Sequence, residues 1–271
     1  MTDPTADTPR TVATARTVAT ARTVATLRAA GCVFAEEEAA LLSAEARDPG
    51  HLDTMVAARV AGLPLEQVVG WADVEGVRVR MRPGVFVPRR RSALLVRLAA
   101  AEVRTGHETV VDLCCGSGAL SAALLAHHPD LDLHASDVDP AATACARSNL
   151  PPERVHDGDL YDALPPHLRG RIDVLVVNAP YVPTAAIATM PPEARDHERH
   201  LALDGGADGL AVQRRVIALA PTWLAPGGLL VLETGRTQTA TAAALMEDAG
   251  LDPHQHGAPD IDGWAISGRQ V

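Results

Sequence analysis

Residues 109–120 read TVVDLCCGSGAL, and this stretch decides the fold class. A short apolar run ends in a turn that contains Gly116 and Gly118, and the helix-forming segment ALSAALLAHH follows. The same order of an apolar strand and a helix recurs in LDLHAS with PAATACARSNL and in GGLLVLE with TQTATAAALMEDAG. Strands that alternate with helices predict a parallel sheet covered on both faces. We therefore expect an α/β fold with a Rossmann-like sheet.

The chain before this region has a different texture. Residues 10–27 contain RTVATA twice and then RTVATL, and a period of six turns each Arg to a different face of a helix. This pattern favours a low-complexity, disordered extension over residues 1–26 rather than a targeting or docking segment. Residues 27–70 carry apolar residues at helical spacing, which predicts a small helical domain. We expect this domain to recognise the substrate. Alternating valines and arginines over residues 71–90 predict a β-hairpin connector, which leaves residues 91–271 for the α/β domain.

Composition narrows the class of protein. The formal net charge of −10 disfavours nucleic acid as the main partner, because an acidic chain repels phosphate backbones. The four cysteines form no CxxC pair, which favours reduced thiols in the cytoplasm over disulfides or a zinc site. No apolar run approaches the ~18 residues that cross a bilayer, and no secretory signal is evident. We expect a cytoplasmic protein without membrane segments.

Ligands of parallel sheets bind at the carboxyl ends of the strands. Gly116 and Gly118 let a ligand lie against bare main chain, although Ser121 occupies the place of the third glycine of a dinucleotide fingerprint. Asp137 ends the next strand, 137 − 116 = 21 positions after Gly116, and an acid at about that offset binds ribose hydroxyls. The turn therefore predicts a cofactor that contains a ribose.

Two cofactors fit these residues. A nicotinamide dinucleotide brings a pyrophosphate, which carboxylates repel and which prefers a helix N-terminus. S-adenosylmethionine instead carries an ammonium and a sulfonium, and Asp112 just before the glycine turn suits a cation better. Asp159, after the third strand, is placed to hold an adenine amino group. S-adenosylmethionine is the preferred cofactor, and a nicotinamide dehydrogenase is the alternative for this fold.

The stretch VVNAPYVPT, residues 176–184, predicts the chemistry. Methylation of an amide or aromatic amine is difficult because the nitrogen lone pair is delocalised, and two fixed hydrogen-bond acceptors favour a pyramidal nitrogen. The side-chain carbonyl of Asn178 and the main-chain carbonyl of Ala179 are two such acceptors. Pro180 has its φ locked and holds Ala179 extended, and Tyr181 supplies a flat wall. The alternative is an ordinary turn at a strand end, where Asn and Pro are common.

Together these segments resemble the protein-(glutamine-N5) methyltransferases that modify peptide-chain release factors, the PrmC/HemK family. GLPLEQVVG resembles the interdomain segment of that family, VFVPRR its signature before the catalytic domain, and DLCCGSG its cofactor loop. NAPY corresponds to the family motif N-P-P-Y, and LALDGGADGL and LAPGGLLVLETG also fit. The resemblance implies a class I methyltransferase domain over residues 91–271, S-adenosylmethionine as the methyl donor, and the glutamine of a Gly-Gly-Gln motif as the acceptor.

The resemblance also implies roles for individual residues. Catalysis falls to Asn178, Ala179, Pro180 and Tyr181, and the acceptor pocket to Phe86, Pro88, Arg89 and Tyr181. Donor binding falls to Asp112, Cys114, Gly116, Gly118, Asp137, Val138, Asp159, Leu160 and Asn178. No metal is implied, and His197 with His200 lacks an evident third ligand.

Two departures from the family motifs keep alternatives open. Ala179 replaces the first Pro of N-P-P-Y, and Arg90, Arg91 and Ser92 stand after PR, where the family usually has acidic residues. A release factor is therefore the expected protein partner, while an N-methyltransferase of small-molecule amines or amides and a non-catalytic donor-binding protein remain alternatives. DNA methylation is disfavoured by the acidic charge and by the lack of an evident recognition domain.

Overall fold

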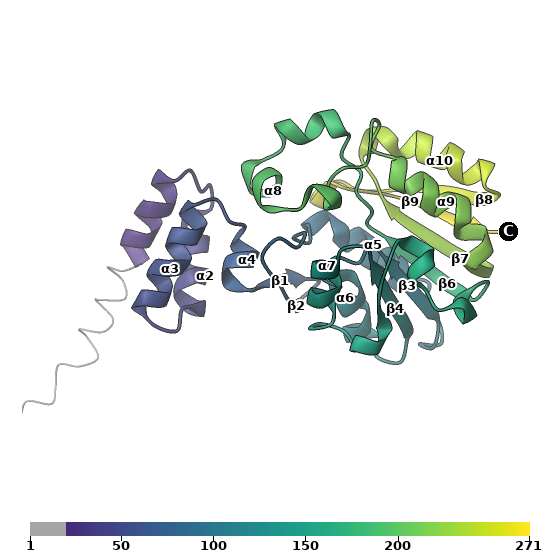
Figure 1. Ribbon diagram of the computed structural model, residues 1–271, viewed down its shortest axis with the longest axis horizontal. Coiled ribbons are helices and arrows are strands. Elements are labelled where there is room, and N and C mark those ends of the chain that lie inside the picture. The colour runs from purple at the N-terminus through teal and green to yellow at the C-terminus, as the bar shows by residue number, and fades with distance from the viewer. Residues whose placement is uncertain (1–19) are drawn as a thin grey trace, which may run out of the picture. The chain divides into compact units, whose positions relative to one another are not determined.

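The computed structural model describes residues 20–271 and divides between Gly70 and Trp71 into two compact units (Figure 1). The extension expected over residues 1–26 lies, up to residue 19, outside the described residues. Residues 20–26 are helical, so this part of the expectation is wrong. The physical reason is apolar burial, because Val24 packs against the same core as the fully buried Leu27.

The first unit is a small helical bundle. A helix runs from residue 20 to residue 29, and it is followed by α2 (Ala35–Glu45), α3 (Pro49–Val60) and α4 (Leu65–Val69). The helices bury a small apolar core that includes Leu27, Leu42 and Met55. Asp48 caps α3 by accepting a hydrogen bond from the His51 main-chain nitrogen at 2.8 Å, and Pro49 occupies the first helical turn.

A buried ion pair joins α2 to α3 inside this bundle. The Nε and Nη2 atoms of Arg59 donate to the two carboxylate oxygens of Glu38 at 2.7 and 3.2 Å, in fork geometry. Both side chains are less than a tenth exposed. Buried charges are tolerated when they are paired and hydrogen-bonded, so this pair fixes how the two helices pack.

The second unit begins with the expected hairpin. Strands β1 (Trp71–Val74) and β2 (Val77–Arg80) pair antiparallel, with Val74 opposite Val77. Val74 and Val79 belong to the same apolar cluster as the helices on one face of the main sheet. Asn149 binds both the main-chain nitrogen and the carbonyl oxygen of Arg80, at 2.8 and 3.0 Å. The hairpin is therefore a packed part of the α/β unit.

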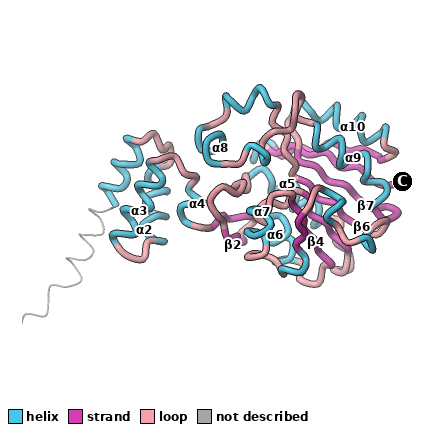
Figure 2. Tube along the Cα trace, in the orientation of Figure 1, coloured by secondary structure: helices cyan, strands magenta, loops and turns pink. Residues whose placement is uncertain are grey.

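Seven strands form the main sheet, in the order β5-β4-β3-β6-β7-β9-β8. Figure 2 draws the strands in magenta. The first five of these in the order are parallel, whereas β9 runs antiparallel to both β7 and β8. The strands are β3 (Thr109–Leu113), β4 (Asp132–Asp137), β5 (Val155–Asp157), β6 (Ile172–Val177), β7 (Leu224–Glu233), β8 (Leu251–Ala258) and β9 (Gly263–Gln270). The expectation of a parallel sheet is thus wrong at β9, which runs against all the other strands; β8 keeps their direction and pairs with β9 as a hairpin.

Helices cover both faces of this sheet (Figure 1). Alternate residues along a strand point to opposite faces, and Val110 and Val111 of β3 belong to different apolar clusters. One cluster includes residues of α9 (Ala211–Trp223) and α10 (Thr239–Asp248), and the other includes residues of α5 (Ala93–Ala100) and α6 (Ala119–His127). The remaining helices are α7 (Pro140–Ala146) and α8 (Pro192–His197). Among residues 20–271, no helix is both long and apolar enough to cross a bilayer.

The Arg59–Glu38 pair gives the first prediction. Glu38→Ala leaves the guanidinium of Arg59 buried without its carboxylate, and breaking a buried pair in this way costs roughly 3–5 kcal/mol. Faster amide hydrogen exchange is expected throughout α2 and α3. Glu36→Ala is the matched control, because it breaks an ion pair with Arg28 in which both side chains are more than half exposed. Equal exchange in the two variants would contradict the structural role of the buried pair.

Candidate active site

A cavity of about 280 Å³ opens at the carboxyl ends of β3, β4 and β6, within the α/β unit. Nearly all of the residues expected from the sequence to bind donor or acceptor line it: Phe86, Pro88, Arg89, Cys114, Gly116, Asp137, Val138, Asp159, Leu160, Asn178, Ala179, Pro180 and Tyr181. Asp112 and Gly118 do not line it. The strand ends therefore gather most of the predicted site in one place.

The glycine turn between β3 and α6 forms one wall. Gly116 has φ +56°, and a Cβ added there meets no atom within 4 Å, so bare main chain borders open space. Gly118 has φ +75°, and its Cβ comes within 2.8 Å of Leu150 Cδ1, so this glycine permits packing rather than ligand contact. Cys114 holds φ +59° without being glycine, a conformation that is uncommon for other residues and that concentrates at functional sites.

Asp112 lies behind the cavity wall instead of in it. Its side chain is 1% exposed, and its Oδ2 accepts a hydrogen bond from Ser121 Oγ at 2.8 Å. Its Oδ1 has no partner among residues 20–271. Burial raises the pKa of Asp112 to about 7, against the lowering effect of the Ser121 hydrogen bond. The structure thus places Asp112 behind the residues that line the cavity, with one carboxylate oxygen that has no partner among residues 20–271.

The two other predicted carboxylates face the cavity. Asp137 accepts hydrogen bonds from the main-chain nitrogens of Gly116 and Asp139, each at 2.9 Å, while burial raises its pKa above the ordinary value. Asp159 is exposed and pairs with Arg215, which also lines the cavity, at 2.7 Å. Carboxylates at this wall suit ribose hydroxyls and a cationic ligand, and they disfavour a pyrophosphate.

Two buried hydroxyls test whether a polar cofactor fits. Ser117 Oγ and Ser136 Oγ line the cavity, are buried, and have no hydrogen-bond partner in the described part of the chain. Buried polar groups in native proteins are usually satisfied, so each marks a place where a ligand completes the bonding. Together with the bare main chain at Gly116 and the carboxylate of Asp137, they fit S-adenosylmethionine.

The segment Asn178–Ala179–Pro180, whose first residue carries an amide side chain, follows directly after β6. The side-chain nitrogen of Asn178 donates to Ser92 Oγ at 3.2 Å, which orients the amide. Neither Asn178 Oδ1 nor the main-chain oxygen of Ala179 accepts a hydrogen bond from any described residue. Ala179 is 1% exposed, and Pro180 follows it. Two carbonyl oxygens of residues that line the cavity therefore have no hydrogen-bond donor among residues 20–271.

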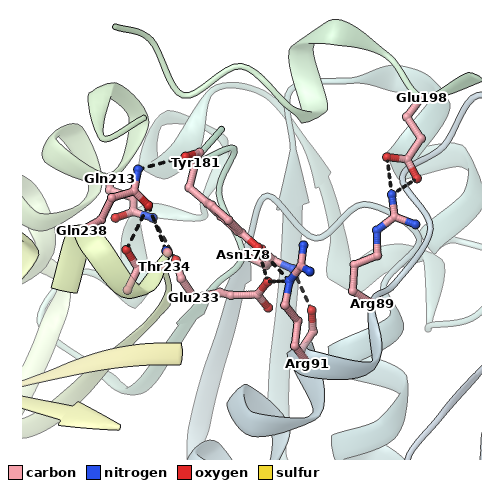
Figure 3. Close-up of polar contacts among 11 residues, drawn as sticks. Arg89, Arg91, Asn178, Tyr181, Glu198, Gln213, Glu233, Thr234 and Gln238 are labelled. Carbon is pink, nitrogen blue, oxygen red and sulfur yellow. Dashed lines mark hydrogen bonds and ion pairs between the residues drawn. The ribbon is translucent and has the colours of Figure 1, made fainter. Parts of the chain in front are cut away.

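Tyr181 is held at its hydroxyl by two charged residues (Figure 3). Its hydroxyl donates to Glu233 Oε1 at 2.9 Å and accepts from Arg91 Nε at the same distance. Arg91 Nε also lies 3.3 Å from Glu233 Oε1. Burial, followed by the charge of Glu233, raises the pKa of Tyr181, so the phenol stays protonated.

Main-chain contacts fix the same residue from the other side. Gln238 Nε2 donates to the carbonyl oxygens of Tyr181 and Asp208 at 3.0 and 2.9 Å. Gly209 packs so closely that an added Cβ stands 2.2 Å from the Tyr181 carbonyl oxygen, which requires glycine at this position. The segment after Asn178 is therefore clamped along its main chain and at its phenol.

Arg89 is engaged differently from the expectation that it binds the acceptor. It lines the cavity, but its Nη2 donates to both carboxylate oxygens of Glu198 at 2.7 and 2.8 Å, and the Glu198 side chain is fully buried (Figure 3). Its guanidinium lies 5.1 Å from the ring centroid of Phe86. This pair ties the segment after α8 to the segment before α5.

Sequence reasoning missed several residues of the site. Glu233 ends β7, and the strand-end rule that found Asn178 applies to it equally. Ser92 and Arg91 stand out in the sequence only as a departure from the family signature. Nothing in the local pattern shows that their side chains contact Asn178 and Tyr181. The four cysteines are free thiols, as the sequence predicts. Burial raises the pKa of Cys114 and Cys115 well above the ordinary thiol value.

Metal chemistry has no support in the described part of the chain, where no three His, Cys, Asp or Glu side chains gather as a ligand set.

Comparison with known proteins gives the family. The model of the Methyltransferase small domain family matches residues 76–194. A release factor glutamine methyltransferase of Mycobacterium tuberculosis is 35% identical over 221 residues, covering 79% of this chain and 72% of that protein. This chain belongs to the release factor glutamine methyltransferase family.

A second relative is at least as similar over a greater length. The 4-amino-L-phenylalanine/4-methylamino-L-phenylalanine methyltransferase of Streptomyces pristinaespiralis is 36% identical over 255 residues, covering 86% of this chain and 87% of that protein. Among solved structures, a methyltransferase from Pyrococcus furiosus shares the fold, with a TM-score of 0.55, 14% identity, and coverage of 80% of this chain and 98% of that chain.

Membership of this family settles the cofactor and the reaction class. The protein is an S-adenosylmethionine-dependent methyltransferase with the class I methyltransferase fold. The expectation of S-adenosylmethionine is confirmed, and the nicotinamide dehydrogenase alternative is wrong.

Asp112 predicts a pH dependence of stability. An aspartate in the unfolded chain has a pKa of about 4, so the fold with a pKa of about 7 binds this proton more tightly. The protonated Asp112 therefore contributes on the order of 4 kcal/mol to the free energy of unfolding. This contribution is present below about pH 4 and is lost as the pH rises through about 7. Because Asp112→Asn cannot titrate, its stability relative to the wild type should increase over this range in urea unfolding. Parallel pH profiles for the two proteins would refute the buried carboxyl.

The two glycines of the turn predict different losses. Gly116→Ala places a methyl group in open space on the cavity wall, so donor affinity by calorimetry should fall at least tenfold with only the modest strain of a positive φ, about 1–2 kcal/mol. Gly118→Ala adds the collision with Leu150, so its main effect should be a lower melting temperature. Unchanged donor affinity in Gly116→Ala would exclude this wall from the donor site.

Proposed function

We propose that the protein transfers a methyl group from S-adenosylmethionine to a planar, conjugated nitrogen held at Asn178 and Ala179. The first acceptor is the side-chain amide of a protein glutamine, in the Gly-Gly-Gln motif of a peptide-chain release factor. The observation that carries this proposal is the pair of open carbonyl oxygens, Asn178 Oδ1 and Ala179 O, in the wall of the cavity. The names of several relatives support the release factor as partner.

The chemistry of the acceptor explains why two neutral oxygens are needed. The lone pair of an amide nitrogen is delocalised into its carbonyl group, so the nitrogen is a weak nucleophile. Two acceptors that bind its N–H groups favour a pyramidal nitrogen, and they stabilise the positive charge that develops as it reacts. An aspartate in place of Asn178 adds a full negative charge and loses the nitrogen that Ser92 holds.

Rigidity of the corner makes these acceptors effective. Ala179 precedes a proline, which disfavours the helical conformation and keeps its carbonyl in an extended segment. The clamp on Tyr181 fixes the other end of the segment, and its ring borders the acceptor position. What S-adenosylmethionine supplies here is an electrophilic methyl group on a sulfonium. The protein's own residues hold the nitrogen in place and keep the acceptors oriented before reaction.

A second acceptor is favoured by two specific observations. The relative matched over 87% of its length is named a 4-amino-L-phenylalanine/4-methylamino-L-phenylalanine methyltransferase. The aromatic amine of such an amino acid is also a planar nitrogen with a delocalised lone pair. In addition, Arg91 places a cation in the cavity, at a point where the family usually has an acid. We propose an amino acid with an aromatic amine as this second acceptor, and the cytoplasm as the place where the protein acts.

Asn178→Ala tests the proposed reaction. Loss of one oriented acceptor should lower the rate of methyl transfer by roughly 100-fold or more, while donor affinity by calorimetry stays within about threefold. Mass spectrometry after incubation with donor reads methylation of the release factor glutamine in one reaction and of 4-aminophenylalanine in the other. Gln255→Ala, on the exposed face of β8, is the control and should behave as the wild type. A rate for Asn178→Ala near that of the wild type would refute the proposed role.

A further inference from the structure

Arg91 brings an arginine into a site built around neutral acceptors. It belongs to the segment between the hairpin and α5, lines the cavity, and keeps 39% of its side chain exposed. Only its Nε is used by the protein, toward Tyr181 Oη at 2.9 Å and Glu233 Oε1 at 3.3 Å. Its two terminal nitrogens have no hydrogen-bond partner in the described part of the chain, and Figure 3 shows them on the side away from Glu233.

The guanidinium is held both charged and fixed in direction. Burial works against its charge, but the neighbouring Tyr181 and Glu233 outweigh burial and raise the pKa of Arg91 above the ordinary value. Glu233 is itself almost completely buried at the end of β7. An arginine fixed through Nε leaves its two terminal nitrogens as a fork that matches a carboxylate.

The other two arginines of the cavity are committed elsewhere. Arg89 donates through one nitrogen to both oxygens of a fully buried Glu198, and Arg215 is paired with Asp159 at its cavity wall. Arg91, which also lines the cavity, differs because the contact through its Nε leaves both terminal nitrogens without a partner among residues 20–271. An internal glutamine of a protein chain brings no charge of its own, whereas a free amino acid brings a carboxylate with its side-chain nitrogen.

We propose that Arg91 is a specificity-determining residue that binds a carboxylate of the methyl acceptor, most simply the α-carboxylate of a free amino acid whose side chain ends in a conjugated nitrogen. The inference rests on the proposed function, because it takes the reacting nitrogen to lie at Asn178 in the same cavity. An acidic side chain next to the target glutamine of a protein acceptor offers the same carboxylate chemistry, and the experiment separates these two sources.

The test compares 4-aminophenylalanine with its carboxamide, which has the same shape but no negative charge. Binding is measured by calorimetry in the presence of S-adenosylhomocysteine, and methyl transfer is measured separately with S-adenosylmethionine. We expect wild-type protein to bind the acid roughly 10- to 100-fold more tightly than the carboxamide. Arg91→Gln should abolish this preference without altering affinity for the carboxamide. Arg90→Gln is the matched control, because it removes the same charge from an exposed neighbour outside the cavity wall.

The release factor forms the second arm. If the carboxylate belongs to a protein acceptor, Arg91→Gln lowers methylation of the release factor at least tenfold and the free amino acid does not bind. Equal binding of acid and carboxamide by the wild type, together with unchanged release factor methylation in Arg91→Gln, would overturn the inference. A loss that is equal for acid and carboxamide would show that Arg91 only positions Tyr181, which also overturns it. Binding that depends on Arg91 without any methyl transfer would support the carboxylate site and refute the proposed function instead.

Discussion

The buried carboxylate of Glu233 is the constraint on which the acceptor side of the site depends. It lies at the end of β7 and accepts hydrogen bonds from the Tyr181 hydroxyl and from Arg91 Nε. One carboxylate thus joins three segments that are far apart in the chain. A carboxylate taken out of water needs hydrogen bonds, and Tyr181 and Arg91 supply them at Oε1, while Oε2 has no partner among residues 20–271. Because Gln238 and Gly209 fix the main chain of the same tyrosine, the corner that begins at Asn178 cannot relax when a ligand binds. Acceptors held in advance in this way need no reorganisation during reaction.

The sheet explains why donor and acceptor meet. Strands β4, β3 and β6 are parallel neighbours, so Asp137, the glycine turn and Asn178 end at one edge although 62 positions (178 − 116 = 62) separate Gly116 from Asn178. The donor wall is made of carboxylates, unpartnered hydroxyls and bare main chain, whereas the acceptor wall is made of carbonyl oxygens, a ring and a guanidinium. Each wall thus has the chemistry that suits the group the proposed reaction would place against it. Figure 3 shows Arg91, Asn178 and Tyr181 of this second wall beside one another.

Strand periodicity and strand-end chemistry were enough to predict the α/β fold, the cavity position and most of its lining. They succeeded for Asn178, Asp137 and Asp159 because the carboxyl ends of parallel strands coincide whatever the loops do. They failed where tertiary contacts decide. Asp112 carries the same signal as Asp137, but the Ser121 hydroxyl binds it from beneath the turn. Strand β8 is polar and exposed, so its pairing with β9 leaves no apolar alternation to detect. The helix over residues 20–29 begins in a repeat whose period of six does not produce an amphipathic face, so the sequence pattern does not reveal it. The position of Arg91 at the cavity depends on tertiary contacts that the local sequence does not show.

The family and the site agree on the reaction, and the departures from the family concern what the acceptor carries besides its nitrogen. Ala179 keeps the carbonyl that the reaction needs, while Arg91 adds a cation that a glutamine amide does not require. The most direct test of the central claim is a crystal structure with S-adenosylhomocysteine and an unreacted acceptor bound together. The account predicts the acceptor nitrogen at hydrogen-bond distance, about 3 Å, from both Asn178 Oδ1 and Ala179 O, with the donor sulfur on its other side. A nitrogen bound away from these two oxygens, or a sulfur that faces another wall, would contradict it.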